Sequence, residues 1–206
     1  MTDRTVIHVI DDDESLRSAL DSLFRSTGLG VRLYESVAAF LASPPPEGEY
    51  GCLVLDVRLP GMSGLDFQQR LDEHGIRLPV ILMTGHGDIP MTVRAMKAGA
   101  VDFLAKPFRD QEMLDAVAVA LERDRAQRAE HGKLDAVRSL YATLSPREQQ
   151  VMALVAAGKL NKQVAGDLEL SEITVKIHRG AAMRKMGARS LADLVRMAET
   201  LGLKTE

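Results

Sequence analysis

Short apolar runs alternate with helix-like segments along residues 1–122. The runs are too short for soluble helices and are rich in aliphatic residues, which indicates buried strands. In chain order they are TVIHVI, VRLY, CLVLD, LPVILMT and VDFLA. Segments with apolar residues at helical spacing follow them, the later ones at 65–73, 89–97 and 110–121. Five strands alternating with five helices predict an α/β fold, a doubly wound parallel (βα)5 sheet covered on both faces.

The pattern changes in residues 143–206, where helix signals replace the strand-like runs. Ser145 to Glu148, SPRE, reads as a capping box with Pro at the first helical position. We expect Asn161 to cap a second helix, Ser171 to cap a third, and a last helix to occupy 191–201. Four short helices predict a small all-α domain of the helix-turn-helix kind.

Residues 123–142 differ in composition from both flanking parts, because they are charged and rich in Ala. They are expected to extend the fifth helix, which then breaks near Gly132. An apolar stripe of Leu134, Val137 and Tyr141 can pair with a second copy of the chain or lie against a domain, and the sequence leaves both open. The predicted parts are therefore a domain at 1–122, a helical linker at 123–142 and a domain at 143–206.

The amino-acid composition excludes several classes of protein. The chain is 46% hydrophobic and 27% charged, as is usual for globular proteins. No run approaches the ~18 apolar residues of a membrane span, and the first residues turn acidic too early for a signal peptide. We expect a cytoplasmic protein without a membrane partner. The single cysteine, Cys52, excludes a disulfide framework.

The net charge of −3 hides an asymmetry between the two parts of the chain. Residues 1–122 hold 11 Lys or Arg against 19 Asp or Glu, whereas residues 123–206 hold 15 against 10. An acidic first part suits cation binding, and a basic second part suits a phosphate backbone.

Polar residues lie at the carboxyl ends of four predicted strands. Asp11 and Asp12 follow the first strand, Asp56 ends the third, Thr84 ends the fourth, and Lys106 follows the fifth. These ends share one edge of a parallel sheet, where ligands bind. Neighbouring carboxylates repel one another unless a hard cation lies among them, and Mg²⁺ prefers such oxygens. Because an Asp carboxylate can attack a phosphoryl group, while Lys106 and Thr84 can bind its oxygens, the pattern predicts an aspartyl phosphate on Asp56.

The third helix of the C-terminal domain has one apolar face. With Val175 placed inward, Ala182 and Met186 point inward as well. The candidates for contact with DNA lie on the other face and at the start of the preceding helix: Lys162, Thr174, Lys176, Ile177, Arg184 and Lys185. Arg179 falls near the inward side, where pairing with Glu148 and contact with DNA are both open.

The side chains of this face are expected to contact different parts of the DNA. Lys176 suits a phosphate or a guanine edge, and Ile177 suits a thymine methyl group. Arg184 and Lys185 are expected at phosphates.

Several separated motifs resemble known families. IDDD, LDVRLPGMSG, MTGHGD and AKPF, in this order and spacing, resemble the receiver domain of bacterial two-component response regulators. LSPREQQVM and NKQVAGDLELSEITVKIHR resemble the LuxR-type helix-turn-helix. The pairing resembles the FixJ/NarL family, and GDIPMTVRAMKAGA is especially similar to FixJ- and StyR-like members. The resemblance implies a flavodoxin-like receiver followed by a DNA-binding domain, in a transcription regulator rather than an enzyme.

The resemblance also implies roles for single residues. Asp56 would accept a phosphoryl group from a sensor histidine kinase. Four groups would hold Mg²⁺: the carboxylates of Asp11, Asp12 and Asp56 and the backbone carbonyl of Arg58. Thr84 and Lys106 would contact the phosphate, and Phe103 takes the position of an aromatic switch, with a plain core role as the alternative. Arg58 and His86 stand where family members tune the access of water, a role left open here.

By the same resemblance, phosphorylation would produce a homodimer through the fourth helix, fifth strand and fifth helix. The dimer would bind double-stranded promoter DNA, and RNA polymerase is a further partner that such a regulator can contact.

Two other functions fit the residues less well. A phosphatase of the haloacid-dehalogenase kind would need a second carboxylate two residues after Asp56, where this chain has Arg58. A ligand-sensing LuxR activator would need an aromatic-lined pocket, and the chain has no Trp and three Tyr.

Overall fold

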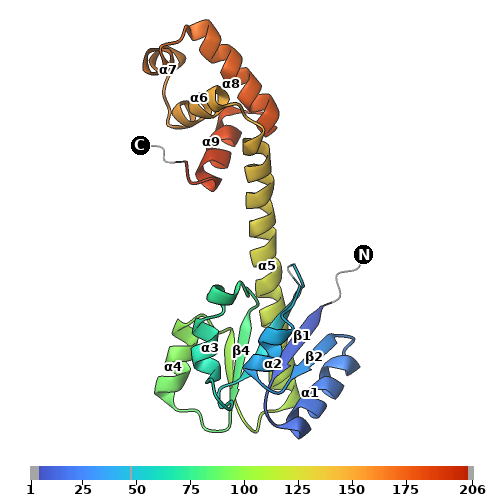
Figure 1. The fold of residues 1–206 in the computed structure, drawn as a ribbon. Coiled ribbons are helices and arrows are strands. Elements are labelled where there is room, and N and C mark those ends of the chain that lie inside the picture. Colours follow the sequence, from blue (N-terminus) through green and yellow to red (C-terminus); the bar gives the residue numbers. More distant parts are fainter. Residues whose placement is uncertain (1–4, 47, 204–206) are drawn as a thin grey trace. The chain divides into compact units, whose positions relative to one another are not determined.

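The computed structural model describes residues 5–46 and 48–203 (Figure 1). The chain divides into two compact units, residues 1–127 and 128–206, and each is described by itself. Among the described residues, no helix has both the length and the apolar character that crossing a membrane requires.

The N-terminal unit is built on a parallel sheet. Its described residues form five strands: β1 (Val6–Ile10), β2 (Gly30–Tyr34), β3 (Gly51–Asp56), β4 (Val80–Thr84) and β5 (Asp102–Ala105). The strand order is β2-β1-β3-β4-β5, with every neighbouring pair parallel. The predicted α/β class is therefore confirmed. The register pairs Asp56 with Met83 and Thr84 with Ala105, so the ends of β3, β4 and β5 lie at one edge.

Helices cover both faces of this sheet (Figure 1). They are α1 (Glu14–Ser26), α2 (Val37–Ala42), α3 (Gly64–Gln69), α4 (Ile89–Lys97) and α5 (Asp110–Ala142). Buried side chains of α2, α3 and α4 pack with Leu53 and Leu55 on one face. Those of α1 and α5 pack with Cys52 and Val54 on the other. Successive residues of β3 thus serve opposite cores, which explains its continuous apolar run.

Two predicted helix ends differ from the structure. The helix expected at 65–73 ends at Gln69, and a short 3₁₀ helix, η1 (Asp72–His74), follows it. The break expected near Gly132 is wrong, because α5 is continuous to Ala142. A mid-helix Gly costs only about 1 kcal/mol, and the surrounding Ala, Glu, Lys, Leu and Arg residues are good helix formers.

The stripe on the last turns of α5 has a partner within the C-terminal unit. Val137 and Tyr141 pack against the hydrophobic core of that unit. Of the two alternatives for this stripe, the structure shows the one in which these side chains lie against the helical domain.

The C-terminal unit contains the predicted helices. Its described residues form α6 (Pro146–Ala156), α7 (Asn161–Leu168), α8 (Glu172–Met186) and α9 (Leu191–Thr200), packed around Val151, Val164 and Val175.

Their N-termini test the capping predictions. The capping box is confirmed, because Ser145 N–H donates to Glu148 Oε2 (2.7 Å) and Glu148 N–H donates to Ser145 Oγ (3.3 Å). Ser171 caps α8 as expected. Asn161 is the first helical residue rather than the cap, because Leu160 holds that position and donates its N–H to Gln163 Oε1.

A buried histidine on β1 joins the sheet to the loop before β3. His8 is fully buried, its Nδ1 lies 3.3 Å from the Tyr34 hydroxyl, and its Nε2–H donates to Glu49 Oε2 at 3.0 Å. Arg32 also pairs with Glu49, at 3.0 Å. Burial and the nearby Arg32 charge lower the pKa of His8 to about 4. The close Glu49 carboxylate does not reverse this shift, because Arg32 already balances its charge.

Because of His8, the N-terminal unit should lose stability in acid. The unfolded chain takes up a proton near pH 6.5, whereas the folded chain resists protonation until pH about 4, so the contribution to stability is complete above 6.5 and is lost between these values. We expect the loss to be on the order of 3 kcal/mol. Urea unfolding of the parent and of His8→Gln between pH 7.5 and 4 measures it.

The difference in unfolding free energy between parent and His8→Gln should shrink as the pH falls. His74→Gln is the control, since His74 is exposed. Parallel pH profiles for the parent and His8→Gln would contradict the assignment.

Candidate functional site

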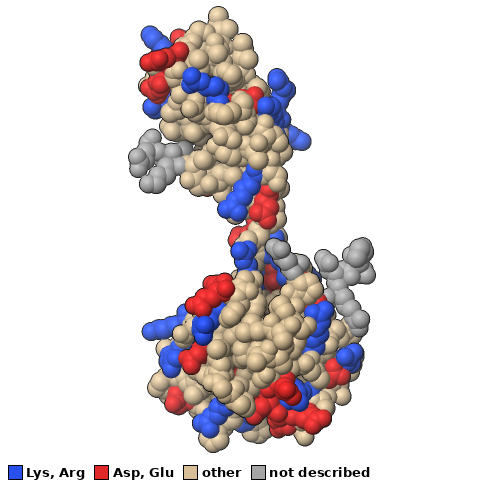
Figure 2. Space-filling model, viewed as in Figure 1, with Lys and Arg blue, Asp and Glu red and all other residues tan. Residues whose placement is uncertain are grey.

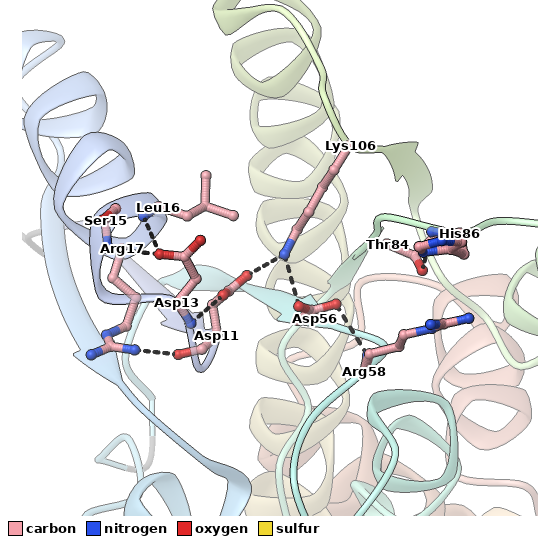
Figure 3. Close-up of polar contacts among 10 residues, drawn as sticks. All are labelled: Asp11, Asp13, Ser15, Leu16, Arg17, Asp56, Arg58, Thr84, His86 and Lys106. Atoms are coloured by element: carbon pink, nitrogen blue, oxygen red, sulfur yellow. Dashed lines mark hydrogen bonds and ion pairs between the residues drawn. The ribbon is translucent and has the colours of Figure 1, made fainter.

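Carboxylates gather at the carboxyl edge of the sheet, as the sequence predicts (Figure 3). Asp11 and Asp12 follow β1, and Asp56 is the last residue of β3, its neighbour. One carboxylate oxygen from each lies within 4.8 Å of the others. Asp11 and Asp56 are buried, whereas Asp12 is exposed.

Lys106 compensates this negative charge. Its Nζ donates to Asp11 Oδ2 at 2.6 Å and to Asp56 Oδ2 at 2.7 Å (Figure 3). Burial disfavours the ammonium form, but the hydrogen bonds to the two carboxylates outweigh it and raise the pKa of Lys106. Burial raises the pKa of Asp11, and the bond from Lys106 opposes that shift. The lysine therefore favours the ionised form of Asp11 and shares its ammonium group between the two carboxylates.

Backbone amides hold the other oxygens of these carboxylates. Asp13 N–H donates to Asp11 Oδ1 at 2.9 Å, and Arg58 N–H donates to Asp56 Oδ1 at 3.1 Å. Asp13 itself caps α1, because its Oδ1 accepts from the N–H groups of Ser15 and Leu16. The site carboxylates are thus oriented by their own loops, and Asp13 stabilises the start of the helix.

The donor set fits magnesium. Three carboxylates within reach of one another offer the hard oxygen ligands that Mg²⁺ takes, and the exposed Asp12 leaves the cluster open to water and to a phosphate. The predicted contribution of the Arg58 backbone carbonyl stays a prediction.

Thr84 lies at the same edge, at the end of β4. It is fully buried, and its Oγ1 accepts from the N–H of His86 at 3.3 Å. The side chains of His86 and Arg58 are exposed and lie on the Thr84 side of Asp56 (Figure 3). Phe103, on β5, is partly buried and packs against the core beneath α3 and α4.

Gly64 is a site residue that the sequence motifs marked only as part of a turn. A Cβ atom on Gly64 would lie 2.1 Å from the backbone oxygen of Asp56, well inside van der Waals contact. The N–H of Gly64 donates to the carbonyl of Val57 at 3.0 Å. The start of α3 therefore packs directly on the backbone that carries Asp56, and only glycine fits there.

The second candidate site is the exposed face of α8. Val175, Ala182 and Met186 are buried as predicted. Ile173 and Ile177 are 71% and 65% exposed, although both are large and apolar. The remaining exposed candidates are basic: Lys162, Lys176, Arg184 and Lys185; Thr174 is half-buried.

Two basic residues of α8 have partners within the domain. Lys185 Nζ donates to Glu148 Oε2 at 2.6 Å and to the carbonyl of Thr143 at 3.3 Å. Arg179 donates to Asn161 Oδ1 at 3.3 Å. Of the two alternatives left open for Arg179, the pairing with Glu148 is not found, because Lys185, in the last turn of α8, is the residue that meets the first turn of α6. The hydrogen bond from Lys185 is also the main cause that lowers the pKa of Glu148.

Charge alone does not mark a surface for DNA on the C-terminal unit. On the face of the C-terminal unit shown in Figure 2, basic side chains form separate groups beside acidic ones. The exposed apolar residues of α8 are the more specific signal, because an isolated soluble domain has no need of them.

Comparison with known proteins finds one family in the N-terminal part of the chain and another in the C-terminal part. The family described as "Response regulator receiver domain" matches residues 7–118, and "Bacterial regulatory proteins, luxR family" matches residues 142–198. Nodulation protein W of Bradyrhizobium diazoefficiens is 60% identical over 200 residues, covering 97% of this chain and 88% of the relative. Transcriptional regulatory protein FixJ of Rhizobium meliloti is 46% identical over 198 residues, covering 96% of each.

Two solved structures are similar to this chain over most of its length. The response regulator StyR superposes with a TM-score of 0.81 at 45% identity, covering 95% of this chain and 98% of StyR. Full-length FixJ from B. japonicum superposes with a TM-score of 0.58 at 39% identity, covering 98% of this chain and 100% of that one.

Replacing Gly64 should strain the Asp56 loop. Because a Cβ would lie 2.1 Å from the Asp56 carbonyl oxygen, the backbone must shift, and we expect Gly64→Ala to lose about 1 to 3 kcal/mol of unfolding free energy. Urea unfolding measures this loss. Gly28→Ala is not a suitable control because its φ is positive, so Gly166→Ala, with open space around it, serves instead. A Gly64→Ala protein as stable as the parent would contradict the steric assignment.

Proposed function

Because the chain belongs to the two-component response regulators that join a receiver domain to a LuxR-type DNA-binding domain, as in the FixJ/NarL family, we propose that Asp56 is its phosphoacceptor. The protein regulates transcription. The observation that carries the proposal is the position of the Asp56 carboxylate, 2.7 Å from Lys106 Nζ and beside Asp11 and Asp12.

The chemistry follows from these contacts. A carboxylate oxygen of Asp56 attacks the phosphorus of a phosphohistidine on the sensor kinase, forming a P–O bond while the P–N bond breaks and the imidazole leaves. Lys106 shifts toward the new phosphoryl oxygens, and the Thr84 hydroxyl donates to one of them. Asp11, Asp12, Asp56 and the Arg58 carbonyl would hold Mg²⁺. When bound, this ion would offset the negative charge of the carboxylates and the phosphoryl group.

Dimerisation is the proposed output of the receiver. The exposed side of α4 carries an apolar stripe, with Ile89 81%, Val93 44% and Met96 46% exposed. The spacing i, i+4, i+7 places these side chains on one face, which suits a second copy of the chain. Phe103 on the neighbouring β5 is the proposed switch, and turning its ring inward after Thr84 moves would reshape this face.

The DNA contacts are proposed from α8 and α7. Lys176 would contact a phosphate or a guanine edge, Ile177 a thymine methyl group, and Arg184 a phosphate. Lys162 and Thr174 complete this face. Lys185 is proposed as a phosphate contact only if it leaves Glu148, since its ammonium group is shared with that carboxylate. We place the protein in the cytoplasm, with RNA polymerase as a further partner.

The phosphoacceptor is tested by Asp56→Asn. The amide is a poor nucleophile, so intact-mass measurement with Mg²⁺ and acetyl phosphate should show one added phosphoryl group on the parent and none on the variant. Sedimentation of the same samples should show a shift from monomer to dimer in the parent alone. The control is Asp72→Asn, an exposed carboxylate in η1. Equal phosphorylation of parent and Asp56→Asn would refute the proposal.

The DNA face is tested by Lys176→Ala. Binding is measured against salt on duplexes recovered by selection from a random-sequence library. If Lys176 contacts a phosphate, the slope of log K against log salt should fall by about 1 with little change in sequence preference. If it contacts a guanine, preference at one base pair should relax. The control is Lys133→Ala, exposed on α5, and an unchanged affinity, slope and preference for Lys176→Ala would rule out the assignment.

A further inference from the structure

Gly87 lies in the loop between β4 and α4, in contact with two side chains from separate strands. A Cβ atom on Gly87 would lie 2.9 Å from Phe103 Cε1, 3.5 Å from Phe103 Cζ and 3.2 Å from Thr84 Cγ2. Carbon atoms of unbonded groups do not approach to 2.9 Å in folded proteins, since van der Waals contact begins near 3.5 Å. Any side chain at position 87 would therefore displace the ring, the methyl group or the loop.

The backbone does not explain the glycine. Gly87 is absent from the glycines with positive φ, so an alanine could adopt its conformation. Gly85 provides the comparison within the same loop: its φ is not positive either, and a Cβ there would meet no heavy atom of the described residues within 4 Å. The two positions differ in their surroundings, and only Gly87 is restricted by space.

The two neighbours of Gly87 differ in how freely they can move. Thr84 is fully buried in β4, and its hydroxyl accepts the N–H of His86. Phe103 is partly buried, so its ring can rotate toward solvent at lower cost. A methyl group on residue 87 would therefore act mainly on the Phe103 ring.

We propose that Gly87 is a positioning residue of the phosphorylation switch. Because residue 87 has no side chain, the Phe103 ring can lie against the loop. At the same time, the Thr84 hydroxyl accepts the N–H of His86 in that loop. This inference rests on the switch roles proposed above for Thr84 and Phe103. In Gly87→Ala the methyl group displaces the ring toward solvent, away from the inward position of the dimeric form, so phosphorylation of Asp56 produces less dimer.

The ring itself supplies the first readout. The full chain is labelled with 4-fluorophenylalanine at its five Phe positions, and the Phe103 resonance is identified by its loss in Phe103→Leu. We expect this resonance to shift in Gly87→Ala and to stay in place in Gly85→Ala. An unchanged Phe103 resonance in Gly87→Ala overturns the proposal.

The second readout is self-association with Mg²⁺ and acetyl phosphate, measured by sedimentation. Gly87→Ala should lower the association constant about tenfold, and Gly85→Ala should leave it unchanged. In the Phe103→Leu background the substitution at 87 should have no effect, because the ring through which it acts is gone. The same decrease in both backgrounds, or none in either, overturns the proposal.

The same variants distinguish a folding defect from a failure of the proposed switch. If Gly87→Ala does not fold, the double variant with Phe103→Leu should restore folding by relieving the contact, and failure to do so counts against the proposal. The switch role of Phe103 is judged independently by the response of Phe103→Leu to acetyl phosphate. A full dimerisation response there removes Phe103 from the proposed function, while a shifted ring resonance in Gly87→Ala would still establish the contact.

Discussion

The receiver depends on the compensation of buried negative charge by Lys106. Asp11 directly follows β1, Asp56 ends the adjacent strand β3, and both are buried. A buried carboxylate without a partner is costly enough to change its protonation. Lys106 follows β5, which β4 separates from β3, so its side chain must extend along the edge of the sheet to reach the two carboxylates. Figure 3 shows the extended lysine that bridges this gap. A shorter cationic side chain on β5 would leave both carboxylates without their partner.

Most of this site could be predicted because a parallel sheet aligns the ends of its strands. Once the apolar runs are recognised as strands, Asp11, Asp56, Thr84 and Lys106 must share one edge, whatever the order of the strands. The division into a sheet and a helical domain follows from the change of hydrophobic period in the same way. Caps made by neighbouring residues, such as Ser145 with Glu148, are equally visible in sequence because they depend on local spacing.

The features that sequence did not show depend on distances between remote residues or on small energy differences. Lys185 rather than Arg179 meets Glu148, which depends on where the last turn of α8 crosses the start of α6. The continuity of α5 through Gly132 is a balance between one unfavourable residue and many favourable ones. The space beside Gly64 and Gly87 is set by the backbone of β3 and the ring of Phe103, and a glycine motif alone does not distinguish a turn from a close approach.

The strand order also bears on how the chain folds as it leaves the ribosome. β1 is made first, yet it lies between β2 and β3, and its Asp11 is 95 residues ahead of the lysine that neutralises it. Until Lys106 has been synthesised after β5, no lysine offsets the repulsion between the carboxylates of Asp11 and Asp56 at the edge of the sheet. The backbone hydrogen bonds inside the helices α6 to α9 join residues close in sequence, and such local contacts form quickly. We therefore expect the unit made last to reach its folded state in less time than the unit made first.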